Sequence, residues 1–243
     1  MSSTFNEFQQ PIGVGLPNWQ SAQFPAAQQI TGRYCKLERI NAERHAQDLY
    51  EAYRDAPDSR DWTYLAAGPF TTFDSMFAYL TKIEAQSDPM HYAVIDLASM
   101  KAVGTLALMR IDTSNGVIEV GWVTYSRRMQ RSRLSTEVMS LLLKYVFEVL
   151  GYRRFEWKCD ALNAPSREAA NRFGFSFEGI FRQAVVVHQR NRDTAWYSII
   201  DSEYPALQAA YKIWLDESNF DASGQQIQRL ADVISKEQSK RSM

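Results

Sequence analysis

The order of hydrophobic patterns between residues 91 and 151 constrains the fold more than any other feature of this sequence. Three strand-like runs come first, at 91–97 (HYAVIDL), 102–111 (AVGTLALMRI) and 117–125 (VIEVGWVTY). Turn signals at Ser99–Lys101 and at Asn115-Gly116 separate them, so they predict an antiparallel meander. A long amphipathic helix follows, with apolar residues at spacings of three and four and Gly151 at its expected end.

After this helix the pattern changes to alternating strands and helices, which is typical of crossover connections. Further strands are expected at 34–40, 153–159, 175–187 and 193–200, and further helices at 42–56, 73–86, 165–173 and 206–217. The sequence therefore predicts an α/β (α+β) protein. We expect one domain at residues 31–203, with an irregular arm at 1–30 before it and a helical extension at 204–243 after it.

Composition excludes several classes of function. The 243 residues carry a formal net charge of −1 and the pI is about 6.3, so no basic field exists to hold nucleic acid or an anionic membrane. No apolar run approaches the roughly 18 residues of a membrane span, and the N-terminus lacks a secretory pattern. Cys35 and Cys159 have no metal-ligand spacing. We expect a cytoplasmic protein that binds neither metal, membrane nor nucleic acid.

Positive charge gathers locally, where the long helix begins. Residues 127–136 contain four arginines and three hydroxyl side chains, namely Arg127, Arg128, Arg131, Arg133, Ser132, Ser135 and Thr136. The first backbone N–H groups of a helix are unpaired and carry the positive end of its dipole, so a helix start attracts phosphate. The cluster is consistent with an anion-binding site and equally with a solvated turn.

Three motifs stand in order along the chain, at 118–122 (IEVGW), 129–137 (MQRSRLSTE) and 163–175 (NAPSREAANRFGF). In this order and spacing they resemble the GNAT superfamily of N-acetyltransferases, and most closely its branch of ribosomal-protein N-terminal acetyltransferases. The resemblance covers residues 31–203. It implies a mixed, mostly antiparallel central sheet flanked by helices, and an enzyme that transfers an acetyl group from acetyl-CoA to a primary amine.

The resemblance also implies where acetyl-CoA binds. In this superfamily the diphosphate rests on a Gln/Arg-x-x-Gly-x-Gly/Ala turn; Gln130 matches its first position, whereas Arg133 and Ser135 replace the two small residues. Because these side chains crowd a position where backbone approaches phosphate, we expect Arg133 to point away or to flank the phosphates. The implied co-substrate contacts are Trp122, Val123, Thr124, Gln130, Arg131, Ser132, Arg133, Leu134, Ser135, Asn163 and Ser166.

Glu119 is a carboxylate inside an otherwise apolar strand. Alternation places Ile118, Val120 and Trp122 on one face, and Glu119 with Gly121 on the other. Glu119 is therefore either an ion-paired structural residue or a general base for the acceptor amine, with its pKa raised by burial.

Ser166 has two interpretations as well. It is either an ordinary residue of a first helical turn or, by the resemblance, a hydrogen-bond donor to the leaving thiolate. Many relatives place a tyrosine for that role four residues before the closing glycine, where this chain has Ala170. The implied mechanism is direct transfer within a ternary complex, without a covalent enzyme intermediate.

The acceptor is expected opposite the coenzyme, against an aromatic wall of Trp62, Tyr64, Phe70 and Trp196, although these side chains are equally typical of a core. The acceptor itself is a small-molecule or peptide amine. Apolar residues of the C-terminal extension are consistent with a homodimer contact and equally with docking onto the same chain. Because the phosphate turn is altered, a non-catalytic acyl-CoA sensor or interaction module on the same fold remains the alternative function.

Overall fold

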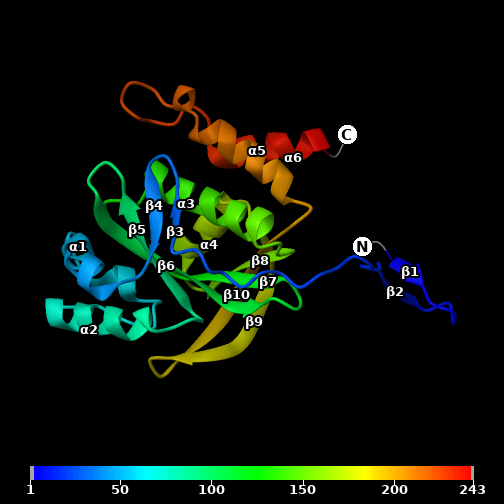
Figure 1. The fold of residues 1–243 in the computed structure, drawn as a ribbon, viewed down its shortest axis with the longest axis horizontal. Coiled ribbons are helices and arrows are strands. Elements are labelled where there is room, and N and C mark those ends of the chain that lie inside the picture. The colour runs from blue at the N-terminus through cyan, green and yellow to red at the C-terminus, as the bar shows by residue number, and fades with distance from the viewer. Residues whose placement is uncertain (1–2, 242–243) are drawn as a thin grey trace.

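A computed structural model describes residues 3–241 and contains an eight-stranded sheet with helices on both faces (Figure 1). The strands are β3 (Gln29–Thr31), β4 (Cys35–Arg39), β5 (Met90–Asp96), β6 (Lys101–Asp112), β7 (Val117–Tyr125), β8 (Arg154–Asp160), β9 (Ser176–Val187) and β10 (Arg190–Ile200). Their order is β3-β4-β5-β6-β7-β8-β10-β9. Only β7 and β8 are parallel neighbours within this sheet, so the predicted mixed, mostly antiparallel fold is confirmed.

Helices form layers on the two faces of the sheet. They are α1 (Ala42–Arg54), α2 (Phe73–Glu84), α3 (Arg133–Lys144), α4 (Ala164–Arg172), α5 (Tyr204–Leu215) and α6 (Leu230–Arg241), with short turns η1 (Ser59–Trp62), η2 (Tyr145–Val149) and η3 (Glu217–Asn219). One apolar core lies between α1, α2 and the sheet, and a larger one between the sheet and α3 to α6. Figure 1 shows α5 and α6 stacked outside α3, as a further layer.

The long helix forms where the sequence predicts it, but its last turn is wider than an α-helix. Val138 and Leu142 are fully buried, as their spacing predicts. The final turn, η2, is π-helical, which shifts the helix face by about one residue. Val149, which continues the apolar spacing of three and four that predicts the buried face, is therefore 53% exposed. Gly151 ends the helix with a φ of +74°, the left-handed conformation that glycine adopts most readily.

Two local predictions differ from the structure. The N-terminal arm is not wholly irregular, because β1 (Ser3–Phe5) pairs with β2 (Pro11–Gly13), and Figure 1 shows this hairpin standing away from the body. The β9–β10 connection was expected to span residues 188–192. It is instead a two-residue turn in which His188 and Gln189 both have positive φ. Such a turn is usually marked by Asn-Gly, and the sequence has no such signal here.

A buried carboxylate fastens α3 to the loop between β3 and β4. Glu137, 5% exposed, accepts hydrogen bonds of 2.7 Å from the backbone N–H groups of Arg33, Tyr34 and Cys35. Gly32 allows this approach, since a Cβ there would lie 2.6 Å from Glu137 Oε2. The start of α3 is thereby fixed against the edge of the sheet.

We expect Glu137→Ala to destabilise the protein by about 2–4 kcal/mol, because it leaves three backbone donors without their acceptor. For a chain of this length the melting temperature should fall by roughly 4–16 °C in a thermal unfolding experiment. Glu168→Ala, at an exposed position on α4, is the matched control and should leave the melting temperature nearly unchanged. Equal melting temperatures for the two variants would contradict this role of Glu137.

Candidate active site

The two parallel strands at the middle of the sheet separate part-way along their length. β7 and β8 are paired from Val117 with Arg154 to Val120 with Trp157. Beyond these pairs, Gly121–Tyr125 and Lys158–Asp160 have no partners in the facing strand, although β6 and β10 still pair with their outer sides. The separation leaves backbone N–H and C=O groups facing each other without a ladder, in a sheet that is otherwise continuous.

A β-bulge in β7 lies next to this separation. Trp122 has a φ of +51°, and Trp122 with Val123 stands opposite the single residue Leu106. The bulge overturns the predicted alternation, because Trp122 lies on the face opposite Ile118 and Val120. Its ring centroid is 6.0 Å from that of His91, on the side of the sheet covered by α1 and α2.

The turn after β7 presents an uncapped helix start. Ser132 is the N-cap residue of α3, but its side chain does not cap the first turn. Instead Ser132 Oγ donates to the carbonyl of Met129 at 2.6 Å, and Ser135 Oγ donates to the carbonyl of Ser132 at 2.9 Å. In contrast, α1, α2 and α4 are capped by Asn41, Thr72 and Asn163. The N–H groups at the start of α3 thus remain available to an anion.

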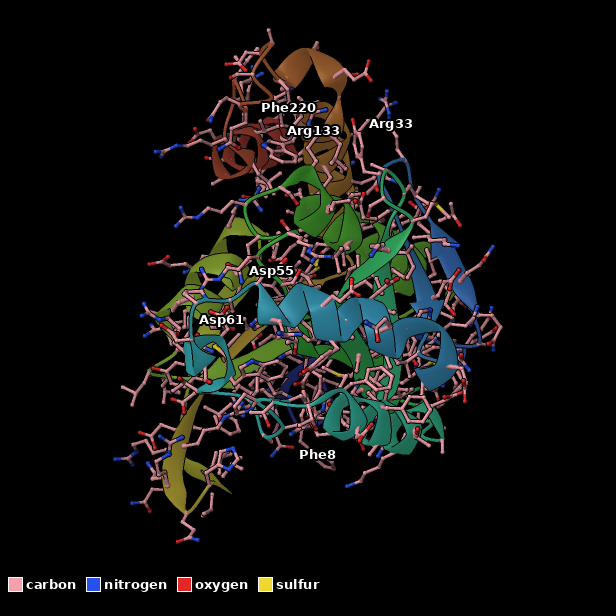
Figure 2. The ribbon with its side chains drawn as sticks, turned by 90° about the vertical axis from the view of Figure 1, so that its left-hand side faces the viewer. Phe8, Arg33, Asp55, Asp61, Arg133 and Phe220 are labelled. Atoms are coloured by element: carbon pink, nitrogen blue, oxygen red, sulfur yellow. The ribbon has the colours of Figure 1, made fainter. Side chains whose placement is uncertain are left out.

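The four arginines of this turn do not form one patch of free positive charge. Arg127 donates to Asp61 at 3.0 Å, and Arg128 donates to Asp55 at 2.6 Å. Asp61 lies within η1, and Asp55 directly follows α1 (Figure 2). Arg133 Cζ lies 3.7 Å from the ring centroid of Phe220. Within residues 3–241, Arg131 alone of the four has neither an ion pair nor a ring contact; it is exposed and has a φ of +56°.

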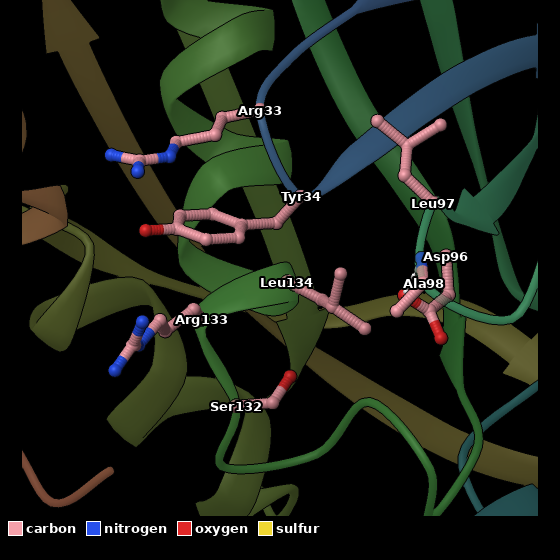
Figure 3. Close-up of a pocket in the computed structure, with 8 residues that line it drawn as sticks. All are labelled: Arg33, Tyr34, Asp96, Leu97, Ala98, Ser132, Arg133 and Leu134. Carbon is pink, nitrogen blue, oxygen red and sulfur yellow. Dashed lines mark hydrogen bonds between the residues drawn. The ribbon is translucent and has the colours of Figure 1, made fainter. Parts of the chain in front are cut away.

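The residues of the turn fit a diphosphate even though glycines are missing. Gln130 Nε2 donates to the carbonyl of Tyr125 at 2.9 Å, which closes the turn onto the end of β7. The Arg133 side chain points to the same side of α3 as Arg33 and Tyr34, and Leu134 points to the other (Figure 3). The first-turn N–H groups are therefore not covered by the arginine.

A cavity of about 470 Å³ lies beside this helix start. It is lined by Arg33, Tyr34, Asp96, Leu97, Ala98, Ser132, Arg133 and Leu134, which Figure 3 shows as sticks. Three of the expected co-substrate contacts, at 132–134, therefore border open space.

Glu119 lies one residue before the point where β7 leaves β8, and it is ion-paired. Its side chain is 5% exposed, with Oε2 2.9 Å from Lys158 Nζ and 3.3 Å from Arg110 Nε. Lys158, equally buried, also lies 2.6 Å from Glu156 Oε2. Burial raises the pKa of Glu119 above its ordinary value, while the charges of Lys158 and Arg110 oppose that rise.

Asn163 and Ser166 are brought together at the start of α4. Asn163 Oδ1 accepts from the backbone N–H of Ser166 at 3.1 Å, and Ser166 Oγ accepts from Trp157 Nε1 at 3.0 Å. Each side chain retains a donor after this bond, the amide N–H₂ of Asn163 and the hydroxyl hydrogen of Ser166. Cys159 lies nearby, and burial raises the pKa of its thiol, which opposes its use as a thiolate nucleophile.

The four predicted acceptor-site aromatics do not form one wall. Trp62 and Phe70 are in contact, with centroids 5.2 Å apart. Tyr64 donates its hydroxyl to the carbonyl of Leu162 at 3.1 Å. Trp196 lies apart from them, stacked on Phe181 at 4.3 Å and 3.8 Å from Lys158 Nζ.

Two residues of the site, Tyr53 and Lys158, were not predicted from the sequence. Tyr53 donates its hydroxyl to the carbonyl of Thr124 at 3.0 Å and contacts Trp62. Lys158 is the cation that meets Glu119. The signal for Lys158 was present in the run EWK, where alternation puts Glu156 and Lys158 on one face of β8, but which residue of β7 they meet depends on strand register.

A family model described as an acetyltransferase (GNAT) domain matches residues 36–176, more than half of the 243-residue chain. The chain belongs to the GNAT acetyltransferase family. The predicted resemblance is confirmed, and the protein is an acyl-CoA-dependent N-acyltransferase that uses acetyl-CoA as its acetyl donor.

Individual relatives of this GNAT acetyltransferase agree with the assignment. A GCN5-related N-acetyltransferase structure from Brucella melitensis is 46% identical, with a TM-score of 0.89 over 90% of this chain and 100% of that one. A GNAT-family structure from Chromobacterium violaceum ATCC 12472 is 41% identical, with a TM-score of 0.74 over 81% and 98% of the two chains. A ribosomal-protein-serine acetyltransferase from Escherichia coli K12 is 30% identical over 103 residues, which is 42% of this chain and 56% of that protein.

The described part of this acetyltransferase has neither a membrane-spanning helix nor a cluster of metal-ligating side chains. No helix within residues 3–241 is long and apolar enough to cross a membrane. Over the same residues, no group of three or more histidine, cysteine, aspartate or glutamate side chains is arranged to hold a metal ion.

We expect Lys158→Met to destabilise this acetyltransferase by about 3–5 kcal/mol at neutral pH, because it leaves Glu119 and Glu156 buried without their shared cation. Lys158 opposes the burial-driven rise in the pKa of Glu119, so this pKa should rise further in the variant. Protonation then favours the folded variant more than the folded wild type, and the deficit should shrink as the pH is lowered. Thermal unfolding from pH 8 to pH 5 measures this trend.

Arg110→Met is the matched control, since Arg110 pairs with the same carboxylate but is 57% exposed. It should cost less than about 1 kcal/mol. A deficit for Lys158→Met that is independent of pH would show that lost packing, and not the loss of the cation shared by Glu119 and Glu156, causes it.

Proposed function

We propose that this enzyme transfers the acetyl group of acetyl-CoA directly to a primary amine within a ternary complex. The observation that carries the proposal is the separation of β7 from β8. The separation begins beside the buried Glu119, and the uncapped start of α3 follows the far end of β7. A base and an anion site thus lie at the two ends of one stretch of unpaired backbone.

The diphosphate of acetyl-CoA binds, in this proposal, at the start of α3. The N–H groups of residues 132–135 hold it, and Arg131 adds charge from the side. The pantetheine arm follows β7 past Trp122, Val123 and Thr124, where its amide groups find the backbone partners that β8 does not supply. The Asn163 amide donates to the same arm from the opposite side.

Glu119 acts as the general base. It takes a proton from the ammonium form of the acceptor, directly or through one water, and the nitrogen lone pair then attacks the acetyl carbon. The N–C bond forms and the C–S bond breaks, while unpaired N–H groups of β7 polarise the carbonyl oxygen. Ser166 donates a hydrogen bond to the departing sulfur, which leaves as thiolate. The attacking nitrogen loses its second proton as the amide forms, and the thiolate takes up that proton to give coenzyme A, while Glu119 returns its own proton to solvent.

The acceptor approaches from the face covered by α1 and α2. Trp62 and Phe70 form an apolar surface there, with Tyr64 fixed against the loop before α4. Trp196 lies farther along the same face, over Lys158. Because one relative is named as a ribosomal-protein-serine acetyltransferase, peptides with N-terminal serine are acceptors to test beside small amines.

An acceptor panel tests the reaction itself. Acetyl-CoA at a hundredfold excess over its dissociation constant should stabilise the protein by about 2.7 kcal/mol in thermal unfolding. Thiol release should then appear with at least one class of amine, either N-terminal peptides or small primary amines. Binding without thiol release from any amine would favour the sensor function, and absence of binding would contradict both functions.

Replacing Glu119 by Gln should lower kcat by about 10²-fold or more, with little change in the KM for acetyl-CoA. In the wild type, kcat/KM should rise with pH through the pKa of Glu119, which lies above the ordinary glutamate value, and the variant should lose this limb. Glu156→Gln disturbs the same lysine and should have a much smaller effect. Turnover of Glu119→Gln that matches wild type across the pH range excludes Glu119 as the base.

A further inference from the structure

The first residue of α3 is held by an aromatic ring from the C-terminal extension. Arg133 Cζ lies 3.7 Å from the ring centroid of Phe220, and 5.7 Å from that of Tyr34. Figure 2 shows Arg133 and Phe220 beside each other, at the junction between α3 and the segment after α5. At 3.7 Å the contact is well within the range of a cation–π interaction.

Phe220 is itself fixed in place. Its ring packs edge-on against Trp214, with centroids 5.1 Å apart and planes at 84°. The preceding residue, Asn219, is 4% exposed, and its side-chain amide donates to the carbonyls of Trp214 and Gln228. Arg33 is ion-paired with Glu217, which ties η3 to the β3–β4 loop. The ring therefore presents a preformed face to the guanidinium.

Arg133 is the first residue of α3, so this contact decides where its charge lies relative to the helix start. A cation at the first residue of a helix meets the positive end of the helix dipole, which disfavours it there. A free side chain at this position has two other places to go, solvent or across the N–H groups of the first turn. In the structure it takes neither, and lies at the side of the helix start instead.

We infer that Phe220 is a positioning residue for acetyl-CoA binding, acting through Arg133. It holds the guanidinium beside the start of α3, where the positive charge attracts the diphosphate without covering the N–H groups that bind it. The inference rests on the proposed placement of the diphosphate at this turn. It gives the C-terminal extension, which lies beyond the family match to residue 176, a part in co-substrate binding.

The contact also explains how the chain tolerates an arginine in a turn that lies so close to phosphate. Ring and guanidinium together fix the side chain in one orientation, so its ordering is complete before the ligand arrives, and less conformational freedom is lost on binding. Lysine is a poor replacement for arginine in this role, since its compact, strongly hydrated ammonium does not lie flat on a ring as a planar guanidinium does.

The test is a set of variants measured by calorimetric titration with coenzyme A and by steady-state kinetics. Phe220→Leu keeps an apolar side chain against Trp214 but removes the ring. It should weaken coenzyme A binding about three- to tenfold, the range that loss of an ordinary cation–π contact corresponds to, and raise the KM for acetyl-CoA equally. The kcat at saturating acetyl-CoA should not change. Phe220→Tyr, which keeps the ring, should retain wild-type affinity.

A double-mutant cycle separates positioning from general destabilisation. Arg133→Ala should weaken binding, and adding Phe220→Leu to it should have no further effect, because the residue being positioned is gone. Arg133→Lys should resemble Phe220→Leu, and it reports on the contact even if the Phe220 variant folds poorly. Phe8→Leu, in the N-terminal arm and 73% exposed, is the matched control and should bind like wild type.

The outcomes distinguish this inference from the proposed function. If Phe220→Leu binds as tightly as wild type or tighter, or weakens binding as much in the Arg133→Ala background, the positioning role is overturned. If neither Arg131→Ala nor Arg133→Ala affects binding although the wild type binds coenzyme A, the diphosphate lies elsewhere, and the proposed placement fails together with the inference.

Discussion

The separation of β7 from β8 is the constraint on which the rest of the site depends. Each buried backbone group left without a partner costs about 1–3 kcal/mol, so a sheet parts at its centre only where water or a ligand can supply the missing bonds. Here the outer sides of both strands stay paired, with β6 and with β10, and the bulge at Trp122 increases the local twist. The opening is therefore bounded on both sides by paired strands, and an extended chain bearing amide groups can complete the ladder.

Ion pairs connect the turn at the end of this opening to neighbouring segments of the chain. Although the chain is nearly neutral, its arginine-rich turn is not a free basic patch, because Arg127 and Arg128 are neutralised by Asp61 and Asp55. These ion pairs connect the turn to the segment that carries Trp62 and Tyr64. Tyr64 in turn bonds the loop before α4. The turn before α3 and the aromatic segment around Trp62 are thus parts of one connected structure.

Local signals predicted the fold well, and the site only in part. Periodicity, Gly151 and the order of motifs were sufficient for the meander, the long helix and the family, since each is set by residues close in sequence. Trp122 was placed on the wrong face because a bulge without glycine leaves no mark in the sequence. The partners of Glu119 and Arg133 depend on strand register and on the docking of a segment almost ninety residues away, which periodicity does not encode.

The pairing of Glu119 bears directly on whether it can serve as a base. A buried carboxylate with no partner would have a strongly raised pKa and would already be protonated, whereas one held tightly by cations would accept a proton poorly. Lys158 lies between Glu119 and Glu156, so when Glu119 takes a proton the ammonium keeps a carboxylate partner at 2.6 Å. Protonation of Glu119 therefore does not leave a buried cation alone, which is the condition that its proposed role in amine deprotonation requires.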